Sequence, residues 1–141
     1  DIVNRFLEII KPKRIFLGNK DYQQLYLINK HIIKKKIGTI VVRCKTIRNK
    51  NGVAYSTRNK LLNKRQILIG SKVYKYLLNI KKSSFVNLEH VKKNILNLGV
   101  KKIDYLEVYD LKNLRKSNKF NKNSKIFIAY YLDNIRLIDN I

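Results

Sequence analysis

The strongest constraint on the fold is the order of apolar patterns in the first third of the chain. Apolar side chains recur at helical spacing over residues 1–10, and a short apolar run follows at residues 14–17. A second helical pattern covers residues 22–36, directly after Asp21 as its cap, and residues 39–43 are again apolar. The apolar face of this second pattern consists of Leu25, Ile28, Ile32 and Ile33. A helix–strand–helix–strand order predicts part of a parallel α/β sheet with short buried strands.

The chain changes character after Cys44, where residues 45–60 are mostly polar. Two helices are predicted beyond this stretch, over residues 63–82 and 86–98, and Gly99 suits the end of the second. Strands are predicted at residues 103–108, 125–132 and 134–138, turns at Asn51–Gly52 and Asp133–Asn134, and a flexible basic loop at residues 115–124. These patterns indicate a small α+β unit with an antiparallel sheet. They divide the chain into residues 1–46 and residues 47–141.

The formal net charge of +23 admits two interpretations. A strongly basic chain is typical of proteins that bind nucleic acid. However, the cations are 24 Lys and only 8 Arg, whereas a nucleic-acid binder tends to use the planar fork of Arg as well. Lys, Asn, Ile and Tyr together supply 70 of the 141 residues, and these four share A/T-rich codons. The second interpretation is therefore a charge of compositional origin.

The single cysteine, Cys44, excludes an internal disulfide and fits a reducing compartment, so we expect a cytoplasmic protein. Its expected role is a small buried side chain at the end of a strand. No apolar run approaches the roughly 18 residues that a membrane span needs, and no membrane association is expected. His31 and His90 stand in no metal or catalytic motif, so both are expected to be surface or structural residues, and no metal-ligating residue is predicted.

The stretch from Gly18 to Gln24 places much polar chemistry directly after an apolar strand. In an open α/β sheet, ligands bind beyond the carboxyl ends of the strands, and a helix that begins there favours an anion. Lys20 adds a charge suited to phosphate, Asp21 can accept from sugar hydroxyls, and Gly18 lets the backbone approach a ligand. Gln24 follows Asp21 on the same helical face. The alternative is a capped surface helix with solvated polar residues.

A second polar stretch contains two adjacent hydroxyls and an arginine, Ser56, Thr57 and Arg58. Two O–H donors, exposed backbone N–H groups and a bidentate cation can clamp a phosphate. The alternative is a Ser/Thr helix cap beside a solvent-facing Arg. Together the two stretches have the parts of a nucleotide site divided between two domains, an arrangement that suits a lid closing over ATP.

Three motifs resemble the pantothenate synthetase (pantoate–β-alanine ligase) family. The family's Gly-Glu-Lys-Asp-Tyr/Phe-Gln-Gln-Leu is similar to residues 18–25, and its Asp-Gly-Leu-Ala-Met-Ser-Ser-Arg-Asn to residues 51–59. Its Arg-Leu-Ile-Asp-Asn is intact at residues 136–140. The chain departs from the family at Asn19, Thr57, Tyr55 and Asp133. The resemblance implies the last strand–helix unit of a Rossmann-like nucleotide-binding domain, followed by a small α+β lid domain.

The resemblance also implies an enzyme that adenylates pantoate with ATP and Mg²⁺, after which the amine of β-alanine attacks the pantoyl adenylate. It assigns the ATP phosphates to Lys20, Ser56, Thr57 and Arg58, of which Lys20, Ser56 and Arg58 are the catalytic residues. It assigns the ribose to Asp21 and the backbone of Gly18, and the adenine to the main chain of Ile47 and Tyr55. It assigns pantoate to Gln24, with Val3 and Ile2 on the apolar side of its pocket.

The family is about twice as long, and its Pro-Thr-Met-Gly and His-x-Gly-His motifs are missing from these residues. We therefore expect a C-terminal half that is inactive alone, within an enzyme that the resemblance implies to be a homodimer. Two rivals stay open at this point. One is a small basic RNA-binding or ribosomal protein, and the other is a decayed gene product that folds poorly.

Overall fold

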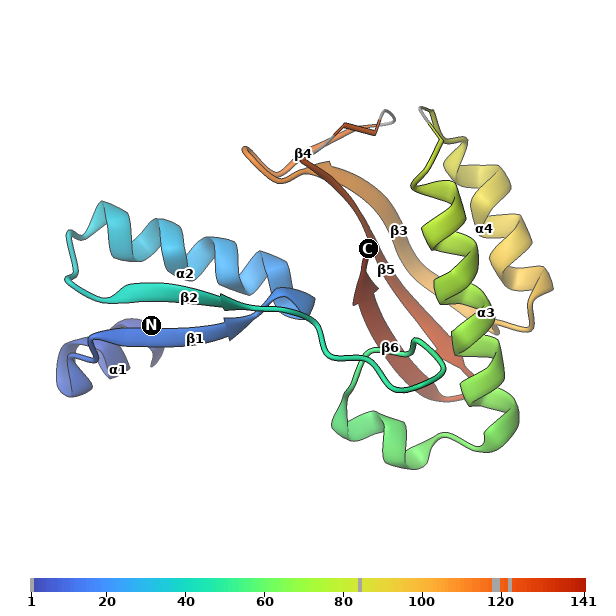
Figure 1. Cartoon of the computed structure of the whole chain (residues 1–141), viewed down its shortest axis with the longest axis horizontal. Helices are drawn as coiled ribbons and strands as arrows, with labels where there is room; N and C mark the ends of the chain where they lie inside the picture. The colour runs from blue at the N-terminus through green and yellow to red at the C-terminus, as the bar shows by residue number, and fades with distance from the viewer. Residues whose placement is uncertain (1, 84, 118–119, 122) are drawn as a thin grey trace. The chain divides into compact units, whose positions relative to one another are not determined.

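The computed structural model describes residues 2–83, 85–117, 120–121 and 123–141. The chain divides into two compact units, Asp1–Thr46 and Ile47–Ile141 (Figure 1). Each unit has its own sheet and its own hydrophobic core. Within the described residues, no helix has the length and apolar character needed to cross a membrane.

The first unit contains two helices and a two-stranded sheet. Its elements are α1 (Ile2–Ile10), β1 (Arg14–Gly18), the 3-10 turn η1 (Asn19–Asp21), α2 (Tyr22–Lys34) and β2 (Ile40–Cys44). The strands pair in parallel, from Arg14 opposite Ile40 to Gly18 opposite Cys44. The predicted element order and the parallel sheet are therefore confirmed, with boundaries shifted by one or two residues.

The core of the first unit lies between the helices and one face of the sheet. Leu7 of α1 packs with Ile28 and Ile32 of α2, and Ile15, Leu17 and Val41 of the strands border this cluster. The predicted burial of the strands is wrong, because alternate side chains point to opposite faces of a sheet and only one face is covered. Phe16 is 66% exposed and Ile40 is 61% exposed on the face that the described helices leave open. Ile33 is also exposed, contrary to its predicted place on the apolar face of α2.

The second unit is an antiparallel sheet with two helices. Its elements are the 3-10 turn η2 (Thr57–Leu61), α3 (Lys64–Ile80), α4 (Leu88–Asn97), β3 (Lys102–Asp110), β4 (Arg115–Lys116), β5 (Ser124–Leu132) and β6 (Ile135–Asn140). The strand order is β4-β3-β5-β6, and every pair is antiparallel. The α+β prediction is confirmed, and β4 falls in the predicted basic loop, part of which lies outside the described residues.

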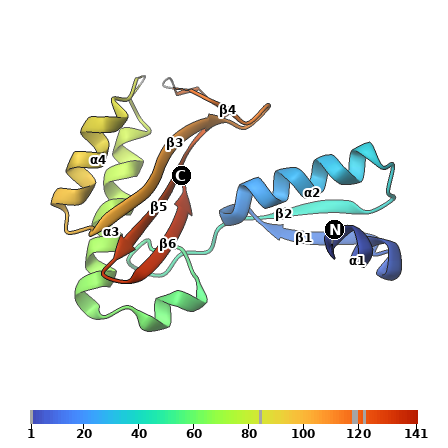
Figure 2. The ribbon, with the colours of Figure 1, turned by 180° about the vertical axis from the view of Figure 1, so that it is seen from behind.

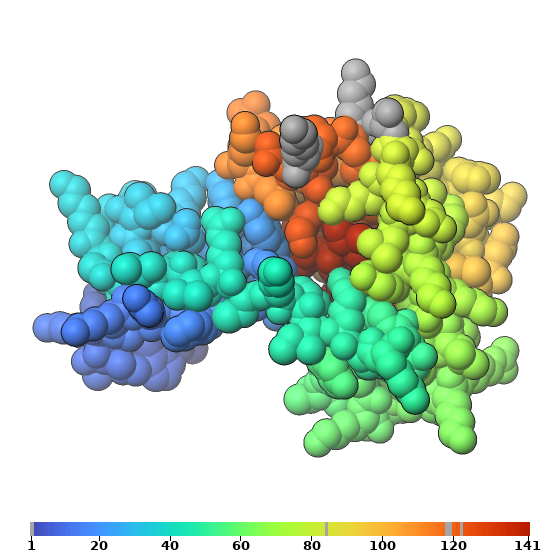
Figure 3. All heavy atoms as spheres, viewed as in Figure 1, coloured from blue at the N-terminus to red at the C-terminus, as the bar shows by residue number. Residues whose placement is uncertain are grey.

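Helices α3 and α4 cover one face of this sheet (Figure 2). Val73 and Leu77 of α3 and Ile95 of α4 pack against Leu106 of β3 and Ile128 of β5, and all five are at most 2% exposed. The space-filling view shows the atoms of α3, in yellow-green, against the orange and red strands (Figure 3). This core holds β6 in place, and β6 is the strand that the second polar stretch contacts.

Local signals set the ends of these elements, and those at Gly99 and Asp133 were predicted from the sequence. Asn63 caps α3 in a capping box, because its side chain accepts from the N–H of Gln66 while the Gln66 side chain accepts from the N–H of Asn63. Gly99 follows α4 with φ +103°, a left-handed conformation that glycine adopts at low cost. Asp133 has φ +52° in the tight turn between β5 and β6. Cys44 ends β2 as predicted, but its side chain is only partly buried.

Candidate functional site

The first polar stretch lies where the sequence places it, beyond the carboxyl end of a parallel strand. Gly18 is the last residue of β1, and Lys20 and Asp21 belong to η1, which leads into α2. Asp21 occupies the N-cap position of α2, as predicted. Its side chain, however, makes no capping hydrogen bond. A Cβ built on Gly18 would have no atom within 4 Å. A ligand can therefore approach this backbone, with the carboxylate of Asp21 exposed beside it.

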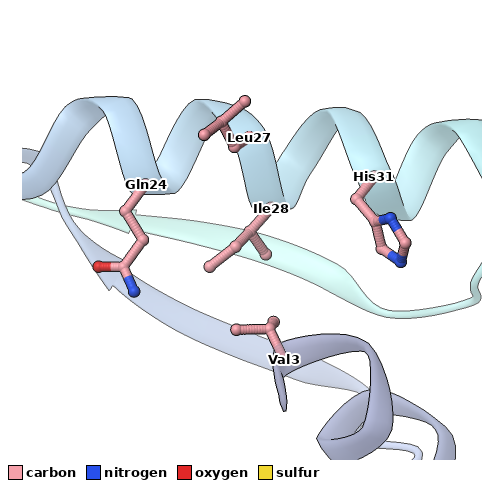
Figure 4. Close-up of a pocket in the computed structure, with 5 residues that line it drawn as sticks. All are labelled: Val3, Gln24, Leu27, Ile28 and His31. Carbon is pink, nitrogen blue, oxygen red and sulfur yellow. The ribbon is translucent and has the colours of Figure 1, made fainter. Parts of the chain in front are cut away.

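A pocket of about 350 Å³ lies between α1 and α2 in the same unit. It is lined by Val3, Gln24, Leu27, Ile28 and His31, and Gln24 and His31 stand at its two ends (Figure 4). The structure thus brings together two of the three residues predicted for pantoate, Val3 and Gln24. The third, Ile2, lines a separate depression and is 76% exposed.

His31 contributes to this pocket, although the sequence indicates only a surface or structural role. Its Nε2 lies 2.6 Å from Oδ1 of Asn4, which joins α2 to α1. The Asn4 amide nitrogen donates to Glu8 at 2.6 Å, so the Asn4 oxygen faces His31 and the imidazole Nε2 is the donor. The position of His31 near Gln24 could have been predicted from the sequence, because residues 24, 28 and 31 share one helical face.

The second polar stretch follows a short hairpin in the other unit, residues 47–55, which we call the 47–55 loop. Arg48 and Ala54 form an antiparallel bridge, and the Tyr55 N–H donates to the Ile47 carbonyl at 2.9 Å. The turn of the loop contains Gly52 with φ +86°. The side chains of Ile47 and Tyr55 are exposed at its open end.

Ser56 and Arg58 make contacts within the second unit that agree with both sequence interpretations. The Ser56 hydroxyl oxygen caps η2 by accepting from the Arg58 N–H at 3.2 Å. Its own O–H is a donor that this cap does not use. The Arg58 guanidinium donates through Nη1 to the Arg136 carbonyl of β6 at 3.1 Å. Thr57 opens η2, and its side chain is exposed. The cap and the phosphate clamp are therefore compatible uses of the same residues.

Arg48 anchors the 47–55 loop, and the sequence did not indicate this role. Its guanidinium donates to both carboxylate oxygens of Asp139, at 2.6 and 2.9 Å. It also donates to the carbonyls of Gly52 at 3.1 Å and Asn140 at 3.3 Å, and it lies 4.1 Å from the ring centre of Tyr74. Burial lowers the pKa of Arg48, but the hydrogen bond and charge of Asp139 outweigh burial and raise it. No local pattern could reveal a partner 91 residues away.

The described residues contain no group of three His, Cys, Asp or Glu side chains that could hold a metal ion. The candidates for binding the nucleotide are divided between the two units: Lys20 and Asp21 belong to the first, and Ser56, Thr57 and Arg58 to the second. Each unit on its own therefore presents a part of the predicted site.

Comparisons with known proteins give consistent results. A family model for pantoate-beta-alanine ligase matches residues 1–141. The pantothenate synthetase of Flavobacterium psychrophilum is 35% identical over 147 residues, which cover 99% of this chain and 52% of that protein. The pantothenate synthetase of Francisella tularensis subsp. novicida is 34% identical over 139 residues, covering 99% of this chain and 47% of that protein.

Solved structures agree with these relatives. A pantothenate synthetase from Thermus thermophilus has a TM-score of 0.84 at 26% identity, covering 99% of this chain and 53% of that one. A pantoate-beta-alanine ligase from Francisella tularensis, complexed with beta-gamma ATP and beta-alanine, has a TM-score of 0.76 at 34% identity. The match covers 99% of this chain and 47% of that one. The chain thus spans about half the length of these proteins. The RNA-binding alternative gains no support, and the chain belongs to the pantoate–β-alanine ligase family.

Proposed function

We propose that this chain acts as the C-terminal half of a pantothenate synthetase, which joins pantoate to β-alanine with ATP through a pantoyl adenylate. The observation that supports this most is the likeness to the Francisella ligase bound to an ATP compound and β-alanine, at 34% identity over 99% of the chain. In this proposal the unit of residues 1–46 is part of a Rossmann-like domain, and the unit of residues 47–141 is a lid. The parallel and antiparallel sheets of the two units suit these roles.

The nucleotide would bind the polar stretches of both units. Lys20, Ser56, Thr57 and Arg58 would hold the phosphates, and Asp21 with the backbone of Gly18 would hold the ribose. The main chain of Ile47 and Tyr55 would hold the adenine. Only one of the two possible backbone bonds between this pair is made among the described residues, from the Tyr55 N–H to the Ile47 carbonyl. The Ile47 N–H and the Tyr55 carbonyl would supply one donor and one acceptor, which complement the amino group and ring nitrogen of an adenine edge.

Pantoate would bind in the pocket that Gln24 and Val3 share. Pantoate is a hydroxy acid in which one chain carbon carries two methyl groups, so it needs both polar and apolar contacts. The Gln24 amide can donate to its hydroxyl or carboxylate, while Val3, Leu27 and Ile28 offer an apolar wall (Figure 4). Ile2 lies outside this pocket, and its proposed contact with pantoate has the weakest structural basis.

Adenylation requires little covalent chemistry from the protein. The pantoate carboxylate is already a nucleophile, so its attack on the α-phosphorus needs no general base. Negative charge builds on the phosphate oxygens, and Lys20, Arg58 and the Ser56 O–H would stabilise it by fixed position and charge. Mg²⁺ is usually held by substrate phosphates with few protein ligands, which fits a described donor set without a metal cluster. The ion would arrive with ATP and neutralise part of its charge.

The test is pyrophosphate release by the full-length protein with pantoate and ATP, β-alanine being omitted. Lys20→Ala should lower the rate by ~10²–10³, as loss of one preorganised charge commonly does. Gln24→Ala should chiefly raise the KM for pantoate, because its amide contacts the substrate before and during the reaction. Unchanged pyrophosphate release by Lys20→Ala would refute the role of this lysine. The 141-residue chain alone should release no pyrophosphate.

Two further features of the full-length enzyme belong to the same proposal. We expect a homodimer, which light scattering of the purified protein would test. We also expect a cytoplasmic location, for which the supporting observation is the family of biosynthetic enzymes to which the chain belongs.

A further inference from the structure

We propose that Arg48 is a positioning residue for the nucleobase, because it fixes the 47–55 loop to the last strand of the second unit. The nucleobase as the ligand rests on the proposed function, whereas the contacts of Arg48 do not depend on it. Arg48 follows Ile47 directly in sequence, and Ile47 is one of the two residues whose main chain would bind adenine. Its own guanidinium is directed at protein groups, so it would act on the nucleobase through the loop.

The guanidinium of Arg48 ties three parts of the unit together. It donates to the side chain of Asp139 at the end of β6 and to the neighbouring carbonyl of Asn140. It also donates across its own hairpin to the carbonyl of Gly52. The guanidinium carbon lies over the ring of Tyr74, which belongs to α3. One side chain therefore determines where the loop sits on both the sheet and the helix.

Among the described residues, the other contacts of the loop are apolar or come from nearby residues, such as the Asn59 amide, which donates to the Ala54 carbonyl at 3.1 Å. Val53 and Ala54 are its buried apolar residues, at 5% and 6% exposure. Asn49 closes the turn locally, since its side chain accepts from the N–H groups of Asn51 and Val53 at 3.0 Å. These bonds shape the hairpin but do not connect it to β6. The connection of the loop to β6 through a planar, multidentate donor is supplied by Arg48.

A lysine could not replace this arrangement. An ammonium is a point charge that cannot span two carboxylate oxygens and two carbonyls in one plane, nor stack on an aromatic ring as a guanidinium does. In the full-length enzyme, Arg48→Lys should raise the KM for ATP by roughly tenfold, since small misplacements of binding groups are costly. The KM for pantoate should stay unchanged, because its proposed pocket lies in the other unit.

A double variant separates positioning from stability. Replacing a desolvated ion pair by apolar residues often restores stability, and the Arg48–Asp139 pair is mostly shielded from solvent. Arg48→Met with Asp139→Leu should therefore recover much of the thermal stability that Arg48→Met alone loses. It should not recover the KM for ATP, because the hydrogen bonds from Arg48 to the carbonyls of Gly52 and Asn140 are still missing. Leu77→Ala serves as the control: Leu77 is fully buried in the core, and its truncation should lower the melting temperature without changing the KM for ATP.

The readouts are the KM values for ATP and pantoate, the preference for ATP over GTP, and hydrogen exchange of the Tyr55 amide without nucleotide. The proposal expects Arg48→Lys to weaken the ATP preference and to speed exchange at Tyr55. It is overturned if the double variant regains both stability and the original KM for ATP, or if Leu77→Ala raises that KM equally. If the unaltered enzyme makes no pyrophosphate, the proposed function fails, while exchange at Tyr55 still decides whether Arg48 holds the loop.

Discussion

Replacing Gly52 by alanine should destabilise the second unit more than the same substitution at Gly18 destabilises the first. Gly52 has φ +86°, which an L-residue with a Cβ adopts only with strain. A Cβ at this position would lie 2.4 and 2.7 Å from two ring carbons of Tyr74. The ring cannot simply turn away, because Arg48 is stacked on it at 4.1 Å.

The expected magnitude follows from these two penalties. The backbone conformation costs alanine about 1–2 kcal/mol. The collision with a packed ring adds about 1–3 kcal/mol, as overpacking in cores does. The free energy of unfolding should therefore fall by about 2–5 kcal/mol, which is a large fraction of the about 5–15 kcal/mol typical of a folded domain.

Urea denaturation followed by far-UV circular dichroism and tyrosine fluorescence measures this change, since the chain has 9 Tyr and no Trp. Gly18→Ala is the matched control. Its φ of −72° is ordinary for alanine, and an added Cβ has nothing within 4 Å, so its stability should change by less than about 1 kcal/mol. Any loss of ATP binding in Gly18→Ala would then reflect contact with the ligand.

A double-mutant cycle with Tyr74→Leu separates the cost of the ring collision from the cost of the backbone conformation. In the Tyr74→Leu background, Gly52→Ala should cost less, because the ring collision is gone and the backbone strain remains. If Gly52→Ala costs less than about 0.5 kcal/mol in the unaltered background, the reasoning from the close contact is refuted. An equal cost in both backgrounds would mean that Tyr74 plays no part.

Two other predictions concern polar contacts in the second unit. Asn63→Ala should lower the free energy of unfolding by about 1 kcal/mol, measured by urea denaturation, because the capping bond to the Gln66 N–H is lost. Burial raises the pKa of Glu107, but hydrogen bonds from Lys116 and Tyr109 outweigh it and hold the pKa below its usual range. Glu107 therefore stabilises the fold at pH values above the unfolded carboxyl pKa and loses this effect as pH falls. The difference in free energy of unfolding between Glu107→Gln and the unaltered protein should therefore become smaller in acid. A difference that grows in acid would contradict this.

The sequence was sufficient for much of the fold because local signals and periodicity agree. The pattern of residues 1–43 predicted the parallel pair, and Asn63, Gly99 and Asp133 stand at ends that their chemistry favours. What failed was the burial of side chains such as Phe16 and Ile33. An apolar run does not say how many faces of a strand are covered, since this depends on elements elsewhere in the protein.

The residues of the candidate site also fall into those that the sequence predicts and those that it does not. Residues in short motifs, such as Lys20 and Ser56, were found from the sequence because their chemistry is local. Arg48 and His31 were missed as site residues, since their partners Asp139 and Asn4 come from distant parts of the chain. Spacing within one element can be read from sequence, whereas a hydrogen bond between elements depends on the packed fold.

The unequal cores of the two units have a consequence for how this protein unfolds. The buried cluster of the first unit has three described residues, Leu7, Ile28 and Ile32, whereas that of the second has fourteen. A two-stranded sheet with so small a core is marginal alone. In the isolated 141-residue chain, we expect residues 1–46 to open at low denaturant and to be cleaved first by protease, while residues 47–141 persist as a cooperative folding unit. A single melting temperature of the isolated chain would then describe only the second unit.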